Sequence, residues 1–197
     1  MSALLSINGL QKSFGAVTVA DATSFDVASG EAVGVLGPNG AGKTSLFNLI
    51  TGTLRSDGGA IRFNGADVTQ ASAATRCKMG IARSFQIPQP FGDMTVFENA
   101  LVGATQGAGL PMGEAEEHAL AVLEETGLLA KANARAGTLT LLERKRLELT
   151  RALSAKPKLL LLDEIAGGLT EAECRSLIDT IKAIHARGTT IICPNDR

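Results

Sequence analysis

A short glycine-rich segment has the spacing of a phosphate-binding loop. The pattern G-x-x-x-x-G-K followed by Ser or Thr is met by Gly37, Pro38, Asn39, Gly40, Ala41, Gly42, Lys43 and Thr44. Glycines let several backbone N–H groups converge on a polyphosphate, and the N-terminus of a following helix adds a favourable dipole. Lys43 would contribute a positive charge, and the Thr44 hydroxyl is a suitable ligand for Mg²⁺. The alternative is an ordinary glycine-rich turn, but the segment lies between a predicted strand and a predicted helix, as the motif requires.

Two acidic residues, Asp163 and Glu164, directly follow the apolar run at residues 159–162. If that run is a strand of a parallel sheet, both carboxylates reach the edge at which ligands bind. Asp163 would then hold Mg²⁺ through a water molecule, and Glu164 would polarise the water that attacks the γ-phosphate. The alternative is that the two acids only open a loop. The phosphate loop favours the first interpretation, because phosphoryl-transfer sites need a second, metal-holding acid.

The elements that would position these groups follow from hydrophobic patterning. Short strands are predicted at residues 4–10, 25–27, 32–36 (a buried type of run), 61–63, 159–162 and 189–193. A helix is predicted to start after Lys43 and to stop near Gly52, and another to start at the capping box Thr170-x-x-Glu173 and close at Gly188. Strands that alternate with helices are typical of a parallel α/β sheet.

The middle third of the chain differs from its flanks. Pro88, Pro90 and Gly92 precede a helix-rich stretch that includes residues 114–126 and 141–155. We therefore predict an inserted helical lobe at about residues 87–155 and a core lobe at about 1–86 and 156–197. Arg144, Lys145, Arg146 and Arg151 are expected to form a solvated basic face of the second helix.

Composition excludes several classes of protein. The 197 residues carry 19 Lys and Arg against 20 Asp and Glu, without Trp or Tyr, so nucleic-acid binding is not expected. No apolar run approaches the ~20 residues that cross a bilayer, and the N-terminus does not have the pattern of a secretory signal. Cys77, Cys174 and Cys193 form no C-x-x-C pair, which is typical of free thiols in the reducing cytoplasm.

Taken together, these motifs resemble the ATP-binding subunits of ABC transporters, most closely those of the branched-chain amino acid uptake type. The resemblance extends over nearly the whole chain. It rests on the phosphate loop from Gly37 to Ser45, on Gln86 in the segment IARSFQ at residues 81–86, and on residues 159–164. The segment FGDMTVFEN at residues 91–99 points to the amino acid uptake branch.

The resemblance implies roles for two further residues. Phe14 stands where family members stack an aromatic ring on adenine, although a lone Phe is otherwise a core residue. Gln86 would reach the Mg²⁺ or the attacking water and couple the site to the transport partner. A solvent-facing loop glutamine is the alternative.

The chain departs from the family pattern at two places. The signature segment, usually Leu-Ser-Gly-Gly-Gln, is Leu-Thr-Leu-Leu-Glu at residues 139–143. Thr140 and Glu143 can still form a capping box, so a helix N-terminus could face the γ-phosphate held by a second subunit. The alternative is structural capping alone, because leucines hinder a close approach of the backbone. The family's switch histidine is replaced by Asn195, whose amide hydrogen-bonds but does not titrate.

The resemblance implies an α/β fold: a P-loop NTPase core with a RecA-like parallel sheet, an N-terminal antiparallel β region and the inserted helical lobe. It implies a cytoplasmic ATPase, peripheral on the inner face of the membrane, that uses ATP and Mg²⁺. Its partners would be a second ATP-binding subunit, transmembrane permease subunits and, indirectly, a solute-binding protein. Two alternatives stay open: a hydrolysis-deficient nucleotide-binding module, and a soluble ABC-type ATPase not linked to transport. A GTPase is disfavoured because the sequence has no Asn-Lys-x-Asp motif.

Overall fold

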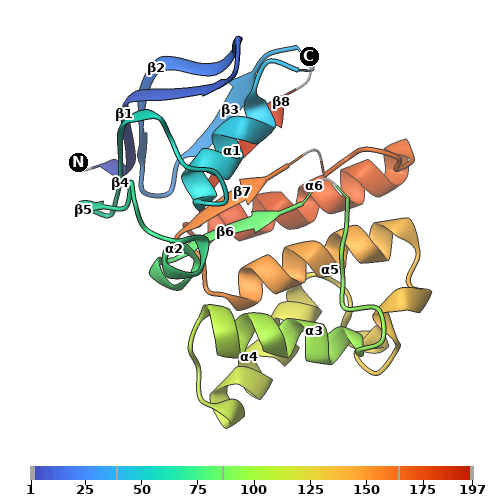
Figure 1. Ribbon diagram of the computed structural model, residues 1–197. Helices are drawn as coiled ribbons and strands as arrows, with labels where there is room; N and C mark the ends of the chain where they lie inside the picture. Colours follow the sequence, from blue (N-terminus) through green and yellow to red (C-terminus); the bar gives the residue numbers. More distant parts are fainter. Residues whose placement is uncertain (1–2, 39, 86, 164, 196–197) are drawn as a thin grey trace.

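The computed structural model describes residues 3–38, 40–85, 87–163 and 165–195 (Figure 1). For Asn195 it describes the backbone only. The described residues form an antiparallel sheet, a parallel sheet, and helices on both sides of the parallel sheet. A group of helices drawn in green to orange lies beyond α5 in Figure 1, away from the antiparallel sheet. The α/β class with an antiparallel β region and a helical lobe is therefore confirmed.

The antiparallel sheet has the strand order β2-β1-β4-β5. Its strands are β1 (Ala3–Phe14), β2 (Val17–Ala28), β4 (Gly58–Phe63) and β5 (Ala66–Asp67). Ile7 pairs with Phe25 on one side and with Ile61 on the other, so β1 is a central strand. The predicted strands at 4–10, 25–27 and 61–63 all lie within these elements, although β1 and β2 extend further into a long hairpin.

The parallel sheet has the strand order β3-β8-β7-β6. Its strands are β3 (Ala32–Leu36), β6 (Ile81–Ser84), β7 (Leu159–Leu162) and β8 (Thr190–Asn195). Parallel neighbours need crossover connections, and these are supplied by helices, as the alternating pattern indicated. The predicted strands at 32–36, 159–162 and 189–193 are confirmed to within a residue or two.

Strand β3 is less buried than its apolar sequence predicts. Val33 and Val35 pack against the first core cluster, but Ala32, Gly34 and Leu36 are exposed, Leu36 by 69%. The physical reason is position: β3 is the terminal strand of the described sheet, and described residues cover only one of its faces.

Helices lie on both faces of the parallel sheet. They are α1 (Lys43–Thr51), α2 (Ala73–Met79), α3 (Val96–Val102), α4 (Met112–Glu125), α5 (Leu141–Ser154) and α6 (Glu171–Ala186), with short helical segments η1 (Gly103–Gly107), η2 (Leu129–Lys131) and η3 (Ala136–Thr138). One core cluster joins α1 to both sheets, and a second joins the opposite face of the parallel sheet to α5 and α6. A third cluster lies among α3, α4 and α5. The capping boxes predicted at Thr140 and Thr170 are both present.

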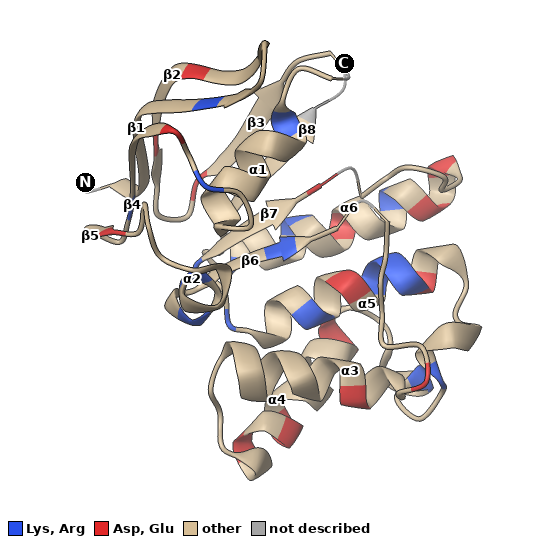
Figure 2. Ribbon diagram, in the orientation of Figure 1, with Lys and Arg blue, Asp and Glu red and all other residues tan. Residues whose placement is uncertain are grey.

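The basic residues of α5 do not form the solvated face that was expected. Lys145 is buried with 6% exposure, and Arg144, Arg146 and Arg151 are half-buried. The reason is that α5 packs on two sides: Leu149 joins the cluster on the parallel sheet, and residue 147 joins the cluster of the helical lobe. Basic and acidic residues are interspersed along α5 and α6 rather than gathered in one stripe (Figure 2).

Among the described residues, no helix is long and apolar enough to cross a membrane.

Candidate functional site

The phosphate loop connects the end of β3 to the start of α1. Helix α1 begins at Lys43, and its N-cap residue Gly42 adopts a left-handed conformation with φ 84°. Within the described part of the chain, no side-chain hydrogen bond caps this helix, and its first turn has no acidic residue. The positive end of the helix dipole is therefore not neutralised from within the helix, as an anion-binding site requires.

Gly42 cannot be replaced by a larger residue without a clash. A Cβ atom at this position would lie 2.6 Å from the carbonyl oxygen of Val19, in addition to the strain of a positive φ. The same contact shows that β2 passes directly beside the phosphate loop. The glycine therefore allows the loop to pack against the antiparallel sheet.

Lys43 lies over its own loop. Its Nζ donates a hydrogen bond to the carbonyl oxygen of Gly37 at 2.5 Å and approaches that of Pro38 at 3.5 Å. Thr44 is exposed and Ser45 is half-buried, while Gly40 and Ala41 form the exposed outer part of the loop. An ammonium group held over a backbone curve of this kind is placed to contact a phosphate that enters the loop.

Phe14 ends β1 as an exposed aromatic residue. It is 52% exposed and pairs with Val17 in the hairpin whose second strand reaches Gly42 through Val19. The Lys12 ammonium lies 5.4 Å from the centre of its ring. The observed exposure excludes the alternative of a core residue.

Asp163 directly follows β7, at the same edge of the parallel sheet as the phosphate loop. All four residues of β7 are buried, and Asp163 itself is only 3% exposed. Its Oδ2 forms an ion pair with Nη2 of Arg83, a residue of β6. Arg83 also donates a hydrogen bond to Oδ1 of Asn48 on α1 at 2.6 Å. Sequence reasoning missed this network, because nothing in the motif indicates that residues 48, 83 and 163 meet.

The opposite end of α1 is anchored by Arg76, another residue that the sequence did not single out. Arg76 is 2% exposed, and its guanidinium donates hydrogen bonds to the carbonyl oxygens of Leu49 and Ile50 at 2.6 and 2.9 Å. It also donates to those of Thr69 and Ala71. A cation at a helix C-terminus satisfies the last carbonyl groups and interacts favourably with the helix dipole.

Thr140 is the N-cap of α5. Its hydroxyl accepts from the N–H of Glu143 at 3.4 Å, and its own N–H donates to Oε2 of Glu143 at 2.9 Å. Hydrogen bonds from the Lys131 ammonium and from the Thr140 N–H hold the pKa of Glu143 below its ordinary value. Leu141 is 43% exposed, whereas Leu142 packs against the second core cluster. The side chain that replaces one signature glycine is thus half-buried and packs against the core.

The segment that precedes α3 is held by an ion pair between two residues of α5. Glu148 is 4% exposed and accepts a hydrogen bond from the N–H of Gln89 at 3.0 Å. Arg151 pairs with Glu148 at 2.9 Å, donates to the carbonyl oxygen of Gln89 and lies 4.7 Å from the ring centre of Phe91. Arg151 had been assigned to a solvated face. It instead fixes the chain that follows position 86.

Three predicted site residues, Asn39, Gln86 and Glu164, lie outside the described residues, as does the side chain of Asn195. Of the remaining residues, the structure places Lys43, Thr44 and Asp163 at one edge of the parallel sheet and links α1 to Asp163 through Arg83 and Asn48. Thr140 lies apart from these residues in the chain and is the N-cap of a different helix, α5.

The chain is similar to known proteins in both sequence and structure. The sequence model of the family described as "ABC transporter" matches residues 20–167. The chain is 35% identical over 203 aligned residues to the high-affinity branched-chain amino acid transport ATP-binding protein LivG of Salmonella typhimurium, with 96% of this chain and 80% of that protein covered. It is 35% identical over 198 residues to the corresponding protein BraF of Pseudomonas aeruginosa, with 93% and 76% covered. The crystal structure of the ADP conformation of an ATP-binding cassette of an ABC transporter superposes with a TM-score of 0.89 at 31% identity, over 100% of this chain and 82% of that one.

Proposed function

The chain belongs to the ABC transporter ATP-binding family, and we propose that it binds and hydrolyses ATP to power an importer of branched-chain amino acids or related small solutes. The observation that carries the proposal is the geometry of one sheet edge. The phosphate loop leaves β3 there and enters α1, and Asp163 leaves β7 at the same edge. The names of the relatives support the class of solute.

Lys43 and the loop from Gly37 to Ser45 would hold the phosphates, and Phe14 would stack on the adenine. Thr44 and Asp163 offer a hydroxyl and a carboxylate for Mg²⁺. Within the described part of the chain, no group of three or more His, Cys, Asp or Glu residues could hold a metal ion. The pair of Thr44 and Asp163 still fits Mg²⁺, because this ion is usually bound by one or two carboxylates together with substrate phosphates. The ion, when bound, neutralises charge on the phosphates during transfer.

Hydrolysis needs a residue that orients water, and we assign this role to Glu164 on its sequence position after Asp163. Gln86 would contact the metal ion or the attacking water and couple the nucleotide site to the permease. The assignment of Gln86 rests on the family resemblance.

The chain would work with a second ATP-binding subunit, and each phosphate loop would face Thr140 of the other. Support for this comes from Thr140 itself, which is exposed at the start of α5. Permease subunits would dock beside Phe85. A cavity of about 400 Å³ lies there between α2, β6, η1 and α5, and its lining also includes Val102 and Glu148. A solute-binding protein would act indirectly, and the complex would place this subunit on the inner face of the membrane.

Glu164→Gln tests the proposal, with single-turnover ATP hydrolysis measured beside binding of a fluorescent ATP analogue. The amide keeps the size of the side chain but cannot orient water as a carboxylate does. We expect analogue binding to be retained and hydrolysis to be suppressed by at least about 100-fold, because general-base groups contribute roughly 10²–10⁴. Unchanged hydrolysis would contradict the assignment of Glu164.

A second candidate is a nucleotide-binding module without hydrolysis, and the observation that favours it is the pair of leucines at 141 and 142. Their side chains stand where the family has small signature residues, and that of Leu142 packs against the second core cluster. This candidate predicts saturable nucleotide binding but no turnover even with permease and partner subunit present. Turnover in the assembled complex would exclude it.

A further inference from the structure

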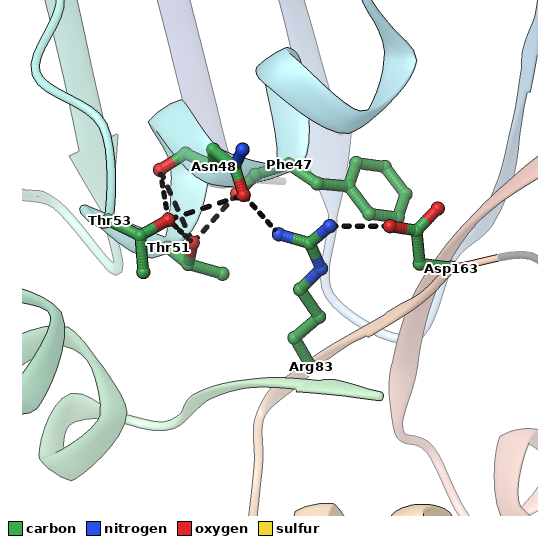
Figure 3. Close-up of polar contacts among 6 residues, drawn as sticks. All are labelled: Phe47, Asn48, Thr51, Thr53, Arg83 and Asp163. Carbon is green, nitrogen blue, oxygen red and sulfur yellow. Dashed lines mark hydrogen bonds and ion pairs between the residues drawn. The ribbon is translucent and has the colours of Figure 1, made fainter. Parts of the chain in front are cut away.

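One buried arginine joins the three elements that build the candidate site. Arg83 comes from β6, the carboxylate of Asp163 follows β7, and Asn48 lies on α1, the helix that begins with Lys43 and Thr44 (Figure 3). Figure 3 shows the guanidinium between the two acceptors, with one terminal nitrogen directed at each. The contact therefore bridges the metal-binding strand and the phosphate-loop helix.

The register of the parallel sheet dictates this meeting. Arg83 is opposite Leu161, and Asp163 lies two residues beyond Leu161 on the same strand path. Residues two apart in a strand point to the same face, so a long side chain at 83 that leans along the strand reaches the carboxylate at 163. Shorter side chains at position 83 would stop before it.

The ion pair is buried and enclosed by rings. The side chains of Arg83 and Asp163 are 5% and 4% exposed. The guanidinium lies 5.6 Å from the ring centre of Phe47 and 5.2 Å from that of Phe85. Its Nε has no hydrogen-bond partner among the described residues, so the two terminal nitrogens carry its polar contacts. A buried charge in such surroundings needs its partner, and both groups are thereby fixed in place.

We propose that Arg83 is a positioning residue that fixes the Asp163 carboxylate for the metal ion and ties it to the phosphate-loop helix. This inference rests on the proposed function. Arg83 engages one carboxylate oxygen, Oδ2, and in doing so sets the direction of the other. Through Asn48 it also sets the position of Asp163 relative to the helix that carries Thr44. Arg83 acts on the metal ion only through Asp163, as residues that orient metal ligands do.

Arg83 should therefore affect nucleotide binding with Mg²⁺ and not nucleotide binding without it. Nucleotide binding without metal depends on Lys43 and the loop, whereas the hydrogen bonds of Arg83 to described residues go to Asn48 and Asp163. The gain in nucleotide affinity on adding Mg²⁺ depends on Asp163, and therefore on Arg83. Lysine is a poor replacement, because an ammonium is a point charge and lacks the planar fork that reaches two acceptors at once.

The test is the ratio of the dissociation constant of a fluorescent ATP analogue in EDTA to that in Mg²⁺. It is measured for the wild type, Arg83→Gln, Arg83→Lys and Asn48→Ala, with Arg187→Gln as the matched control. Arg187 has a side chain that is 67% exposed and pairs with Glu125 away from the site. Melting temperatures of each variant, with and without Mg²⁺ and nucleotide, are the second readout.

We expect Arg83→Gln to lower the ratio by about tenfold or more, in line with the loss found when a group that orients a metal ligand is removed. Its dissociation constant in EDTA should stay within about twofold of the wild type, because the phosphate loop is untouched. Arg83→Lys should restore part of the ratio, and Asn48→Ala should lower it less than Arg83→Gln. Arg187→Gln should match the wild type.

A lowered melting temperature with an unchanged ratio would show a purely structural role and overturn the inference, as would a wild-type ratio of one. If Arg83→Gln does not fold, the Asn48→Ala variant decides, since it keeps the ion pair and removes the link to α1, together with a hydrogen bond from the Thr53 hydroxyl. An unchanged ratio in that variant would then overturn the inference. Absence of nucleotide binding by the wild type would instead overturn the proposed function.

Discussion

Removal of the Arg76 guanidinium should loosen the helix that carries Lys43 and Thr44. The perturbation is Arg76→Met, which keeps most of the apolar stem and removes all the donors. In the folded protein this group donates four hydrogen bonds to carbonyl oxygens, two of them at the C-terminal end of α1. Burial lowers the pKa of Arg76 from its ordinary value, which means that desolvation of the cation offsets part of what these bonds contribute.

The size of the effect follows from these contacts. A hydrogen bond to a charged group contributes about 1.5–3 kcal/mol, and a carbonyl group left buried without a partner costs about 1–3 kcal/mol. Because the four bonds share one desolvated cation, they do not add. We expect a loss of about 3 kcal/mol in the free energy of unfolding, which for a chain of this size lowers the melting temperature by about 6–12 °C.

Urea denaturation followed by circular dichroism measures this loss, provided that the dependence on urea concentration stays the same in both proteins. The control is Arg187→Met, whose side chain is 67% exposed and whose ion pair with Glu125 should contribute no more than about 1 kcal/mol. A loss below about 1 kcal/mol for Arg76→Met, or an equal loss for the control, would refute the reasoning.

Three further predictions concern the loop and the start of α5. Gly42→Ala should weaken nucleotide-analogue binding by at least about tenfold, because its Cβ would meet the Val19 carbonyl oxygen at a positive φ, and isothermal titration checks this. Leu142→Gly should cost about 2–3 kcal/mol of stability and Leu141→Gly about 1 kcal/mol, since only the former side chain packs in the core; equal losses in urea denaturation would contradict this. Hydrogen bonds from the Lys131 ammonium and the Thr140 N–H lower the pKa of Glu143 in the folded state. The contribution of Glu143 to the free energy of unfolding is therefore complete above the ordinary pKa of 4.5 and is lost as the pH falls through the lower pKa of the folded state. Glu143→Gln should therefore differ most from the wild type in melting temperature at neutral pH and converge with it in acid.

Much of the fold could be predicted because its strongest elements carry local signals. The run at residues 159–162 is fully apolar, and the capping boxes at Thr140 and Thr170 mark two helix starts. Helix α2 and strand β6 were missed, because they are 7 and 4 residues long and β6 contains Arg83 at its centre. Segments of that length are too short to show a period.

In the candidate site, too, the residues with a local sequence signal could be predicted, and those brought together only by the fold could not. The phosphate loop and Asp163 could be predicted because their residues are contiguous or lie at the end of a recognisable strand. The ion pair between Arg83 and Asp163 joins residues 80 positions apart and exists only because β6 lies next to β7. The burial of Lys145 likewise depends on two packing partners of α5 that helical periodicity does not reveal.

The most direct test of the account is equilibrium binding of a fluorescent ATP analogue with Mg²⁺ to the wild type and to Lys43→Ala. The ammonium is placed over the loop by Gly37, and a hydrogen bond from a charged group contributes about 1.5–3 kcal/mol. We expect saturable binding that unlabelled ATP displaces, weakened by about 10- to 150-fold in the variant. Equal affinity of the two proteins, with both folded, would contradict the claim that residues 37–45 are the nucleotide site.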